Sequence, residues 1–225
     1  MLFFIFGCCF GSFICLVLER RQKHLSIVFP GSHCGVCQHK LAFYEMIPIV
    51  SIIALRFRCR YCQTKLPLRY LYGETGFGCL GLWLSQQTFS WLRVGQFSWL
   101  FSSLIIALID WQMLIIPLKT LYSSTLAILI CWLLAKQTIY WWQPLILLLF
   151  FWIFQKFFNE GFGGGDIQLL LCWSLFLNVY QIGWLLFIAS GLGLGGFLIL
   201  KIKKSPQKRL PFAPFLTVAL FWLLW

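Results

Sequence analysis

The sequence carries little charge, and acidic residues are especially scarce. Its 225 residues include 18 lysines and arginines but only six aspartates and glutamates, and 60% of the chain is hydrophobic. The mean hydropathy is +0.84. A water-soluble fold of this length would not be so apolar, whereas a polytopic membrane protein would be. We therefore expect an all-α membrane protein.

The N-terminus also lacks basic residues ahead of its first apolar run, at residues 2–18. Glu19, Arg20, Arg21 and Lys23 follow that run instead. A cleavable signal peptide has the reverse order, with its positive charge first. We interpret the run as a retained first helix whose C-terminal end faces the cytoplasm.

Apolar runs of about 15 to 20 residues predict membrane-spanning helices. Eight such helices are expected near residues 2–18, 72–92, 97–115, 118–136, 139–157, 167–182, 183–200 and 211–225. The boundary between the sixth and seventh rests on Gln181, Ile182 and Gly183 alone. The predicted domains are a first helix (1–18), a polar loop (19–71) and a membrane-embedded core (72–225).

Basic residues are distributed unevenly between the two sides of this arrangement. With the N-terminus outside, the connections near 19–71, 116–119, 156–166 and 201–210 lie inside and hold 16 of the 18 lysines and arginines. The positive-inside rule favours this orientation. Basic residues beside spans are also attracted to anionic lipid headgroups. The net charge of +12 therefore indicates membrane lipid as the partner rather than nucleic acid, and the segment KIKKSPQKR at 201–209 is expected to anchor the topology.

The polar loop contains two Cys-x-x-Cys pairs separated by 21 residues. They are Cys34, Cys37, Cys59 and Cys62. Four thiolates in this pattern bind a tetrahedral zinc and organise a loop too small to build its own core. Disulfides are the alternative, but a loop on the cytoplasmic side lies in a reducing compartment. His33 and His39 flank the first pair and would compete as ligands, although we interpret them as ordinary polar residues of the loop.

Only two aspartates occur in the chain, Asp110 and Asp166. Each lies in or against an apolar segment, where an ionisable group indicates function. Two carboxylates that meet in a low-dielectric cleft share a proton and separate into an acid and a base. This is the chemistry of an aspartic protease.

A glycine run, Gly161 to Gly165, ends in Asp166. Without side chains, Gly163, Gly164 and Gly165 would let an extended peptide approach the carboxylate and pair with the loop as an added strand. A phosphate-binding loop is the competing interpretation, but no Gly-Lys-Ser/Thr follows and the charge present is negative.

Taken in order along the chain, these features resemble the type IV prepilin peptidases. The motifs are Gly11-Ser12-Phe13, the cysteine pairs, MIPIVS at 46–51, LRYLYGE at 68–74, Asp110 with Pro117, GGGD at 163–166 and LPFAPFL at 210–216. The resemblance implies an eight-helix aspartic protease of the GxGD type in the bacterial cytoplasmic membrane. Asp110 and Asp166 would be its catalytic pair, facing the cytoplasm, and the four cysteines would hold its structural zinc.

The resemblance also implies substrates and a second activity. The substrates would be prepilins or pilin-like proteins, with the competence-associated members as the nearest branch, and the reaction would remove their short basic leader. Many members also methylate the new N-terminus with S-adenosylmethionine. Glu74 matches a recurrent acid of the family, and its alternative role is a helix-start charge favoured by the helix dipole.

Four positions depart from the family pattern. Cys15 stands where asparagine is frequent, Leu118 replaces an acid, Gln168 replaces a lysine and Ala213 replaces a glycine. None of these changes removes a proposed catalytic carboxylate. Because a nearby lysine helps to keep a carboxylate ionised, Gln168 bears on the rate and the pH optimum more than on the type of reaction.

Two other functions remain open at this point. Asp110 and Asp166 would serve a proton- or cation-coupled transporter if they relayed protons or bound a cation, although we find no internal repeat and a tetrathiolate loop has no role in simple ion transport. A non-catalytic membrane anchor with a zinc loop would leave both acids unexplained.

Overall fold

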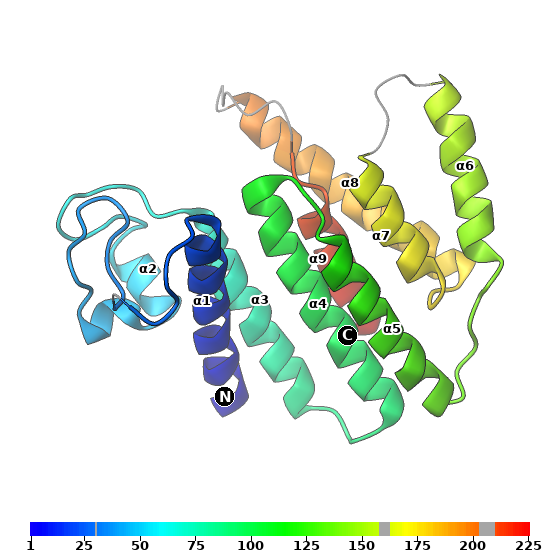
Figure 1. The fold of residues 1–225 in the computed structure, drawn as a ribbon, viewed down its shortest axis with the longest axis horizontal. Coiled ribbons are helices and arrows are strands. Elements are labelled where there is room, and N and C mark those ends of the chain that lie inside the picture. Colours follow the sequence, from blue (N-terminus) through cyan, green and yellow to red (C-terminus); the bar gives the residue numbers. More distant parts are fainter. Residues whose placement is uncertain (30, 158–162, 203–209) are drawn as a thin grey trace. The chain divides into compact units, whose positions relative to one another are not determined.

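A computed structural model describes residues 1–29, 31–157, 163–202 and 210–225 (Figure 1). In these ranges the chain forms nine α-helices, α1 to α9, and one short 3-10 helix, η1. They fall into two compact units, Met1–Gln87 and Thr88–Trp225. The all-helical class expected from composition is confirmed. The functional division at residues 18 and 71 stays a prediction.

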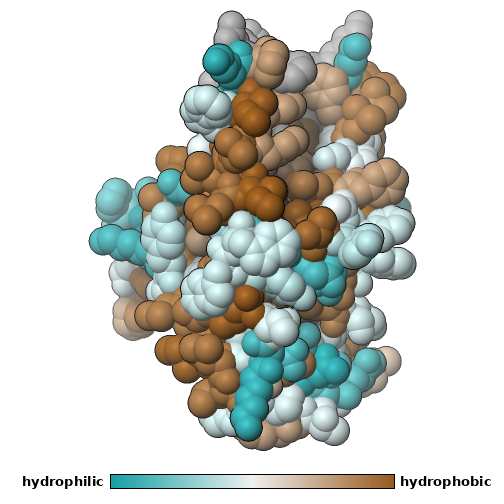
Figure 2. All heavy atoms as spheres, turned by 90° about the vertical axis from the view of Figure 1, so that its right-hand side faces the viewer, coloured by the Kyte–Doolittle hydropathy of each residue, from teal (hydrophilic) through white to brown (hydrophobic). Residues whose placement is uncertain are grey.

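Three helices are long and apolar enough to cross a membrane: α1 (Leu2–Gln22), α4 (Trp91–Met113) and α8 (Val179–Ile202), the last over Val179–Ile199. Shorter apolar helices are α5 (Leu118–Leu134), α6 (Gln143–Phe157) and α9 (Ala213–Leu224). The remaining helices of the expected eight are α3 (Leu68–Ser85) and α7 (Gly164–Ser174). Figure 2 shows the face on the right-hand side of Figure 1, where α6 lies, and apolar and aromatic side chains cover much of it. Such a surface suits lipid, so the chain is a membrane protein.

The boundary between the sixth and seventh expected spans was wrong. The break lies between α7 and α8, before Val179, and not at Gln181 to Gly183. Asn178 and Gln181 form a reciprocal cap there, because the Asn178 side chain accepts the Gln181 N–H at 2.8 Å and the Gln181 side chain accepts the Asn178 N–H at 2.9 Å. This is a capping box, which starts a helix. Gln181 therefore belongs to the first turn of α8.

In the first unit, glycines bring α1 and α3 into backbone contact. A Cβ built on Gly7 would lie 2.2 Å from the Phe77 carbonyl oxygen, and one on Gly11 would lie 2.5 Å from the Gly73 carbonyl oxygen. Small residues permit this close approach between membrane helices. The packed helices α1 and α3 thus hold the two ends of the loop that connects them.

That loop contains η1 (Phe43–Met46) and α2 (Val50–Ala54), and buried polar side chains hold it. The Arg20 guanidinium is buried and donates to the carbonyl oxygens of Ser26, Ile27 and Gly31. Charge-assisted bonds of this kind satisfy a buried cation. The first residues of the loop are therefore wrapped around the end of α1.

Glu74 holds a second point of the same loop. It lies two turns into α3, so the expected alternative of a helix-start charge is wrong. Its buried carboxylate accepts the Ile49 N–H at 2.6 Å. Ile49 has a φ of 61°, which a β-branched residue adopts only under strain. Glu74 therefore stabilises a strained turn that joins the loop to α3.

In the second unit, α4 packs against α5 and α9, and α7 packs against α5 and α6. An aromatic cluster adds a link between α4 and the end of α7. The Trp99 ring of α4 meets Trp132 of α5 at 5.8 Å, Trp173 of α7 at 5.9 Å and Phe176 at 5.4 Å, all edge to face. Such pairs add to the stabilisation from burial. The cluster fixes α7 relative to α4, and these two helices carry the aspartates.

We predict that Gly7→Ala destabilises the protein and that the same change at Gly191 does not. The new methyl group at residue 7 would overlap a backbone oxygen, and overpacking of this kind costs about 1–3 kcal/mol. Nothing lies within 4 Å of a Cβ on Gly191 in α8. Thermal unfolding of both variants in detergent measures the difference. Equal melting temperatures would show that the contact between α1 and α3 is less tight than the structure indicates.

Candidate functional site

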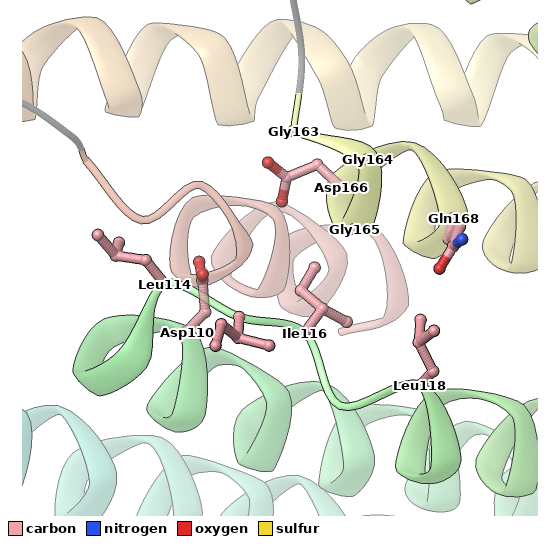
Figure 3. Close-up of a pocket in the computed structure, with 10 residues that line it drawn as sticks. Asp110, Leu114, Ile116, Leu118, Gly163, Gly164, Gly165, Asp166 and Gln168 are labelled. Carbon is pink, nitrogen blue, oxygen red and sulfur yellow. The ribbon is translucent and has the colours of Figure 1, made fainter.

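Asp110 and Asp166 line one cleft of about 400 Å³ in the second unit (Figure 3). The other lining residues are Leu114, Ile115, Ile116, Leu118, Gly163, Gly164, Gly165 and Gln168. The two acids are its only titratable groups among the described residues. Residues 56 positions apart in sequence are thus brought together between the end of α4 and the start of α7. Gly161 lies outside the described residues.

Asp110 lies in the last turn of α4 and is only 6% exposed. Its Oδ2 accepts the backbone N–H of Ala213 at 3.1 Å, at the first residue of α9. Immediately after this turn, Leu114 adopts a left-handed conformation with φ 55°, and its N–H caps α4 by donating to the Asp110 carbonyl oxygen at 2.8 Å. This C-cap ends α4 and is followed by Ile115 and Ile116, which line the cleft.

Asp166 is the third residue of α7, after the N-cap Gly163. An acid in a first helical turn is favoured by the helix dipole. It shares the cleft with Asp110. Between described residues, no hydrogen bond to the Asp166 carboxylate is found. The two carboxyl groups of the cleft therefore have unequal surroundings.

The three glycines of the cleft differ in what they allow. A Cβ on Gly165 would lie 3.1 Å from Ile116, and one on Gly163 would lie 3.2 Å from Asp166 Oδ2, so both permit close packing. Nothing lies within 4 Å of a Cβ on Gly164. Gly165 lets α7 approach Ile116, whereas there is open space beside Gly164. This is room that an extended peptide would need.

The four positions at which the sequence departs from the pattern it resembles are divided between the two units. Leu118 and Gln168 line the cleft and bring no charge to it. Ala213 is buried and contributes its backbone N–H, which a glycine would also supply. Cys15 lies in the first unit, where its thiol donates to the Arg69 carbonyl oxygen at 3.7 Å. Sequence analysis missed the role of Ala213, although Pro214 beside it is a helix-start signal.

In the first unit, the four predicted metal ligands converge. The Sγ atoms of the cysteine quartet, Cys34, Cys37, Cys59 and Cys62, all lie within 4.8 Å of one another, and those of Cys34 and Cys62 are 3.7 Å apart. A disulfide requires about 2.05 Å. A tetrahedral ion with bonds of about 2.3 Å to sulfur separates its ligands by roughly 3.8 Å. The quartet therefore fits one metal ion and not a pair of disulfides.

Two equivalent turns present these cysteines. In the first, the Cys34 N–H donates to His39 O at 2.9 Å and the Gln38 N–H to Cys34 O at 3.0 Å. In the second, the Cys59 N–H donates to Thr64 O and the Gln63 N–H to Cys59 O at the same two distances. Gln38 and Gln63 both have a positive φ. The sequence Cys-x-x-Cys-Gln-x-Lys-Leu occurs at 34–41 and again at 59–66, a short internal repeat that sequence analysis missed.

The histidines beside the quartet do not join it. His33 Nδ1 lies 2.8 Å from the Gly31 carbonyl oxygen, and the His39 ring stacks on Tyr61 at 3.5 Å. Hydrogen bonds to the hydroxyl and the backbone of Thr64, together with those to Cys37 and Cys59, lower the pKa of Cys62 to about 6. The thiolate is the metal-binding form of cysteine, so these bonds favour coordination.

Comparison with known proteins gives a consistent result. The family model for the bacterial peptidase A24 N-terminal domain matches residues 5–88. Three similar proteins share the name prepilin leader peptidase/N-methyltransferase. The protein from Bacillus subtilis is 28% identical over 224 residues, covering 94% of this chain and 88% of its own length. The protein from Legionella pneumophila is 29% identical over 230 residues, covering 91% and 77%.

The third protein, from Myxococcus xanthus, is 37% identical over 131 residues, which cover 55% of this chain and 37% of that protein. No solved structure matches the chain. The matches to relatives of one name extend over nearly the whole sequence, and the motifs of the cysteine quartet and the two aspartates lie within them. Residues 5–88 therefore match the bacterial peptidase A24 N-terminal domain, and nearly the whole chain is similar to proteins named prepilin leader peptidase/N-methyltransferase.

Proposed function

We propose that the protein is an aspartic endopeptidase that removes the short basic leader from type IV prepilins or pilin-like proteins. The main support for the proposal is that Asp110 and Asp166, the only aspartates of the chain, line the same cleft. Every relative described above bears the name of a prepilin peptidase. That name favours peptide hydrolysis over the proton- or cation-coupled transporter, and a non-catalytic anchor would need neither acid.

The chemistry requires one carboxylate and one carboxylic acid. The carboxylate takes a proton from water as the water oxygen bonds to the scissile carbonyl carbon, and the acid donates its proton to the carbonyl oxygen. Breakdown of the tetrahedral intermediate breaks the C–N bond, with a proton passing to the leaving amine. Gly163, Gly164 and Gly165 would line the path of the substrate. No covalent intermediate with the enzyme is needed.

We also propose that the metal of the cysteine quartet is a structural zinc. Four sulfur ligands and a closed tetrahedral arrangement are typical of structural zinc sites. The loop between α1 and α3 has few other means of stabilisation, so metal binding and folding of the loop would be coupled.

The relatives' names add an N-methyltransferase activity. We propose it as a second activity of this chain, with S-adenosylmethionine as the methyl donor and the new pilin N-terminus as the acceptor.

The charge distribution supports a location in the bacterial inner membrane with the cleft toward the cytoplasm. The loop at 19–71 and the basic segment 201–209, of which residues 203–209 lie outside the described part of the chain, would face anionic lipid on that side. A prepilin leader lies in the cytoplasm while its apolar stem remains in the bilayer, so the acids would meet it there.

We expect Asp110→Asn and Asp166→Asn each to lower leader cleavage by about a hundredfold or more, because an amide keeps the shape but accepts no proton. The double variant should be no worse than either single one, since the two residues act as a unit. A gel-shift assay after co-expression with a candidate prepilin measures cleavage. Glu45→Gln, in the loop of the first unit, is the control and should cleave normally. Near-normal cleavage by either asparagine variant would refute the shared mechanism.

Metal analysis of the purified protein should give about one zinc per chain. Cys34→Ser or Cys62→Ser should lose it, because each removes one of four ligands. Cys9→Ser, at an exposed position of α1, should retain it. A metal-free protein with a disulfide between the two pairs would contradict the zinc proposal.

Reporter fusions should place the connecting segments on the sides of the membrane that the distribution of basic residues predicts. A fusion after Lys65 or Lys204 should report the cytoplasm, whereas one after Thr88, between α3 and α4, should report the exterior. An exterior signal from Lys204 would overturn the proposed orientation.

The methyltransferase proposal predicts that mature pilin gains the mass of one methyl group when S-adenosylmethionine is present. Mass spectrometry of pilin processed with and without that compound detects the difference. An unmethylated product under both conditions would restrict the chain to cleavage.

A further inference from the structure

The hydrogen-bonding partners of the two aspartates are different in kind. Asp110 Oδ2 accepts the Ala213 N–H at 3.1 Å, and the backbone of Phe212 hydrogen-bonds the same carboxylate. These groups form the N-terminus of α9, a helix of 12 residues. Helix N-termini carry unpaired N–H groups and a positive partial charge. Asp110 therefore meets donors that favour a negative charge.

Among the described residues, Asp166 has no donors equivalent to those of Asp110. Its carboxyl group lies in the first turn of α7 and so feels that helix dipole, but no described residue donates a hydrogen bond to it. A direct charge-assisted hydrogen bond stabilises a carboxylate more than the dipole of a helix does. Between the two acids, Asp110 is the better place for a charge.

The apolar cleft does not favour two charges. Asp110 and Asp166 line the same cleft, and two carboxylates in one site of low polarity resist joint ionisation. No third titratable group intervenes in the described part of the chain. Of the helices packed against α4 and α7, α9 has no charged residue, Lys119 of α5 is exposed and does not line the cleft, and Lys156 of α6 does not line it either. One acid must therefore keep a proton at neutral pH.

We infer that Asp110 is the ionised carboxylate and general base, that Asp166 keeps the proton and acts as the acid, and that the Ala213 N–H is the positioning group that fixes this assignment. The roles of base and acid rest on the proposed function. The charge state of each aspartate does not rest on that function, because it is a property of the protein without substrate.

The assignment orients the substrate in the cleft. The attacking water lies on the side of α9, next to Asp110, and transfers its proton to that carboxylate. The scissile carbonyl oxygen lies on the side of Gly163 to Gly165 and receives the Asp166 proton. When the C–N bond breaks, the proton held by Asp110 passes to the leaving amine and the hydroxyl proton of the intermediate returns to Asp166, which restores the starting state.

Isotope-edited infrared spectroscopy tests the charge placement directly. Cell-free translation with a suppressor tRNA can place one [4-13C]aspartate at residue 110 or at residue 166 of the wild-type sequence. At neutral pH the label at 110 should show a carboxylate band, and the label at 166 should show a carboxylic acid band. The reverse pattern, or two carboxylates, would overturn the inference.

Ala213→Pro tests the positioning group, with Ala213→Gly as its matched control. Proline removes the N–H and is tolerated at the first position of a helix, whereas glycine retains the N–H. In the proline variant the band of the label at 110 should shift toward the acid form. In a plot of cleavage rate against pH, the acidic limb should move to higher pH, because the base ionises less readily. At the optimum, kcat should fall about tenfold or more while KM is unchanged.

The glycine variant should resemble the wild type in both measurements. An unchanged infrared spectrum and pH profile in a folded proline variant would exclude the Ala213 N–H as the positioning group. If the proline variant does not fold, the site-specific labels in the wild type still decide the charge placement. Failure to cleave any prepilin would refute the proposed function and leave the infrared result intact, whereas reversed bands in an active enzyme would refute this inference alone.

Discussion

The buried carboxylate of Asp110 is the constraint on which the second unit depends. A carboxylate removed from water needs hydrogen bonds, and the start of α9 supplies them. The last helix of the chain must therefore return to the end of α4. Thr217 holds it there, since its hydroxyl lies 3.2 Å from the Ser103 carbonyl oxygen of α4. The C-terminal helix thus contributes to the candidate active site, as do the two helices that carry the aspartates.

In the first unit, too, buried polar groups are satisfied by hydrogen bonds to the backbone. Arg20 is surrounded by backbone carbonyls, Glu74 accepts a backbone N–H, and the cysteine quartet is oriented by hydrogen bonds of two equivalent turns. For Arg20 of α1 and Glu74 of α3, a polar side chain is satisfied by the backbone of the loop. A segment with little core is therefore ordered from both of its ends by α1 and α3 and from its middle by the metal ligands.

Apolar runs located eight of the helices in the described residues because hydropathy reports which segments avoid water, although only α1, α4 and α8 are long and apolar enough to cross a membrane. They did not locate the break before Val179, since the Asn178 and Gln181 cap is a local hydrogen-bond pattern that hydropathy does not record. The scarcity of aspartate singled out Asp110 and Asp166, but their meeting depends on tertiary packing around Trp99. The Ala213 contribution was hidden because its donor belongs to the backbone, whereas the repeated cysteine turns were visible in the sequence and were overlooked.

The two departures that line the cleft explain why helix ends dominate its electrostatics. Leu118 stands in place of an acid and Gln168 in place of a lysine, so the cleft gains no net charge from the pair of changes. Among the described residues that line the cleft, no cation is present, and what remains are the two aspartates and the N-termini of α7 and α9. In this described part of the site, backbone dipoles are the main source of positive potential. The proposed division of roles between the aspartates then follows from which helix end donates hydrogen bonds, and in the described part of the chain α9 alone does so directly.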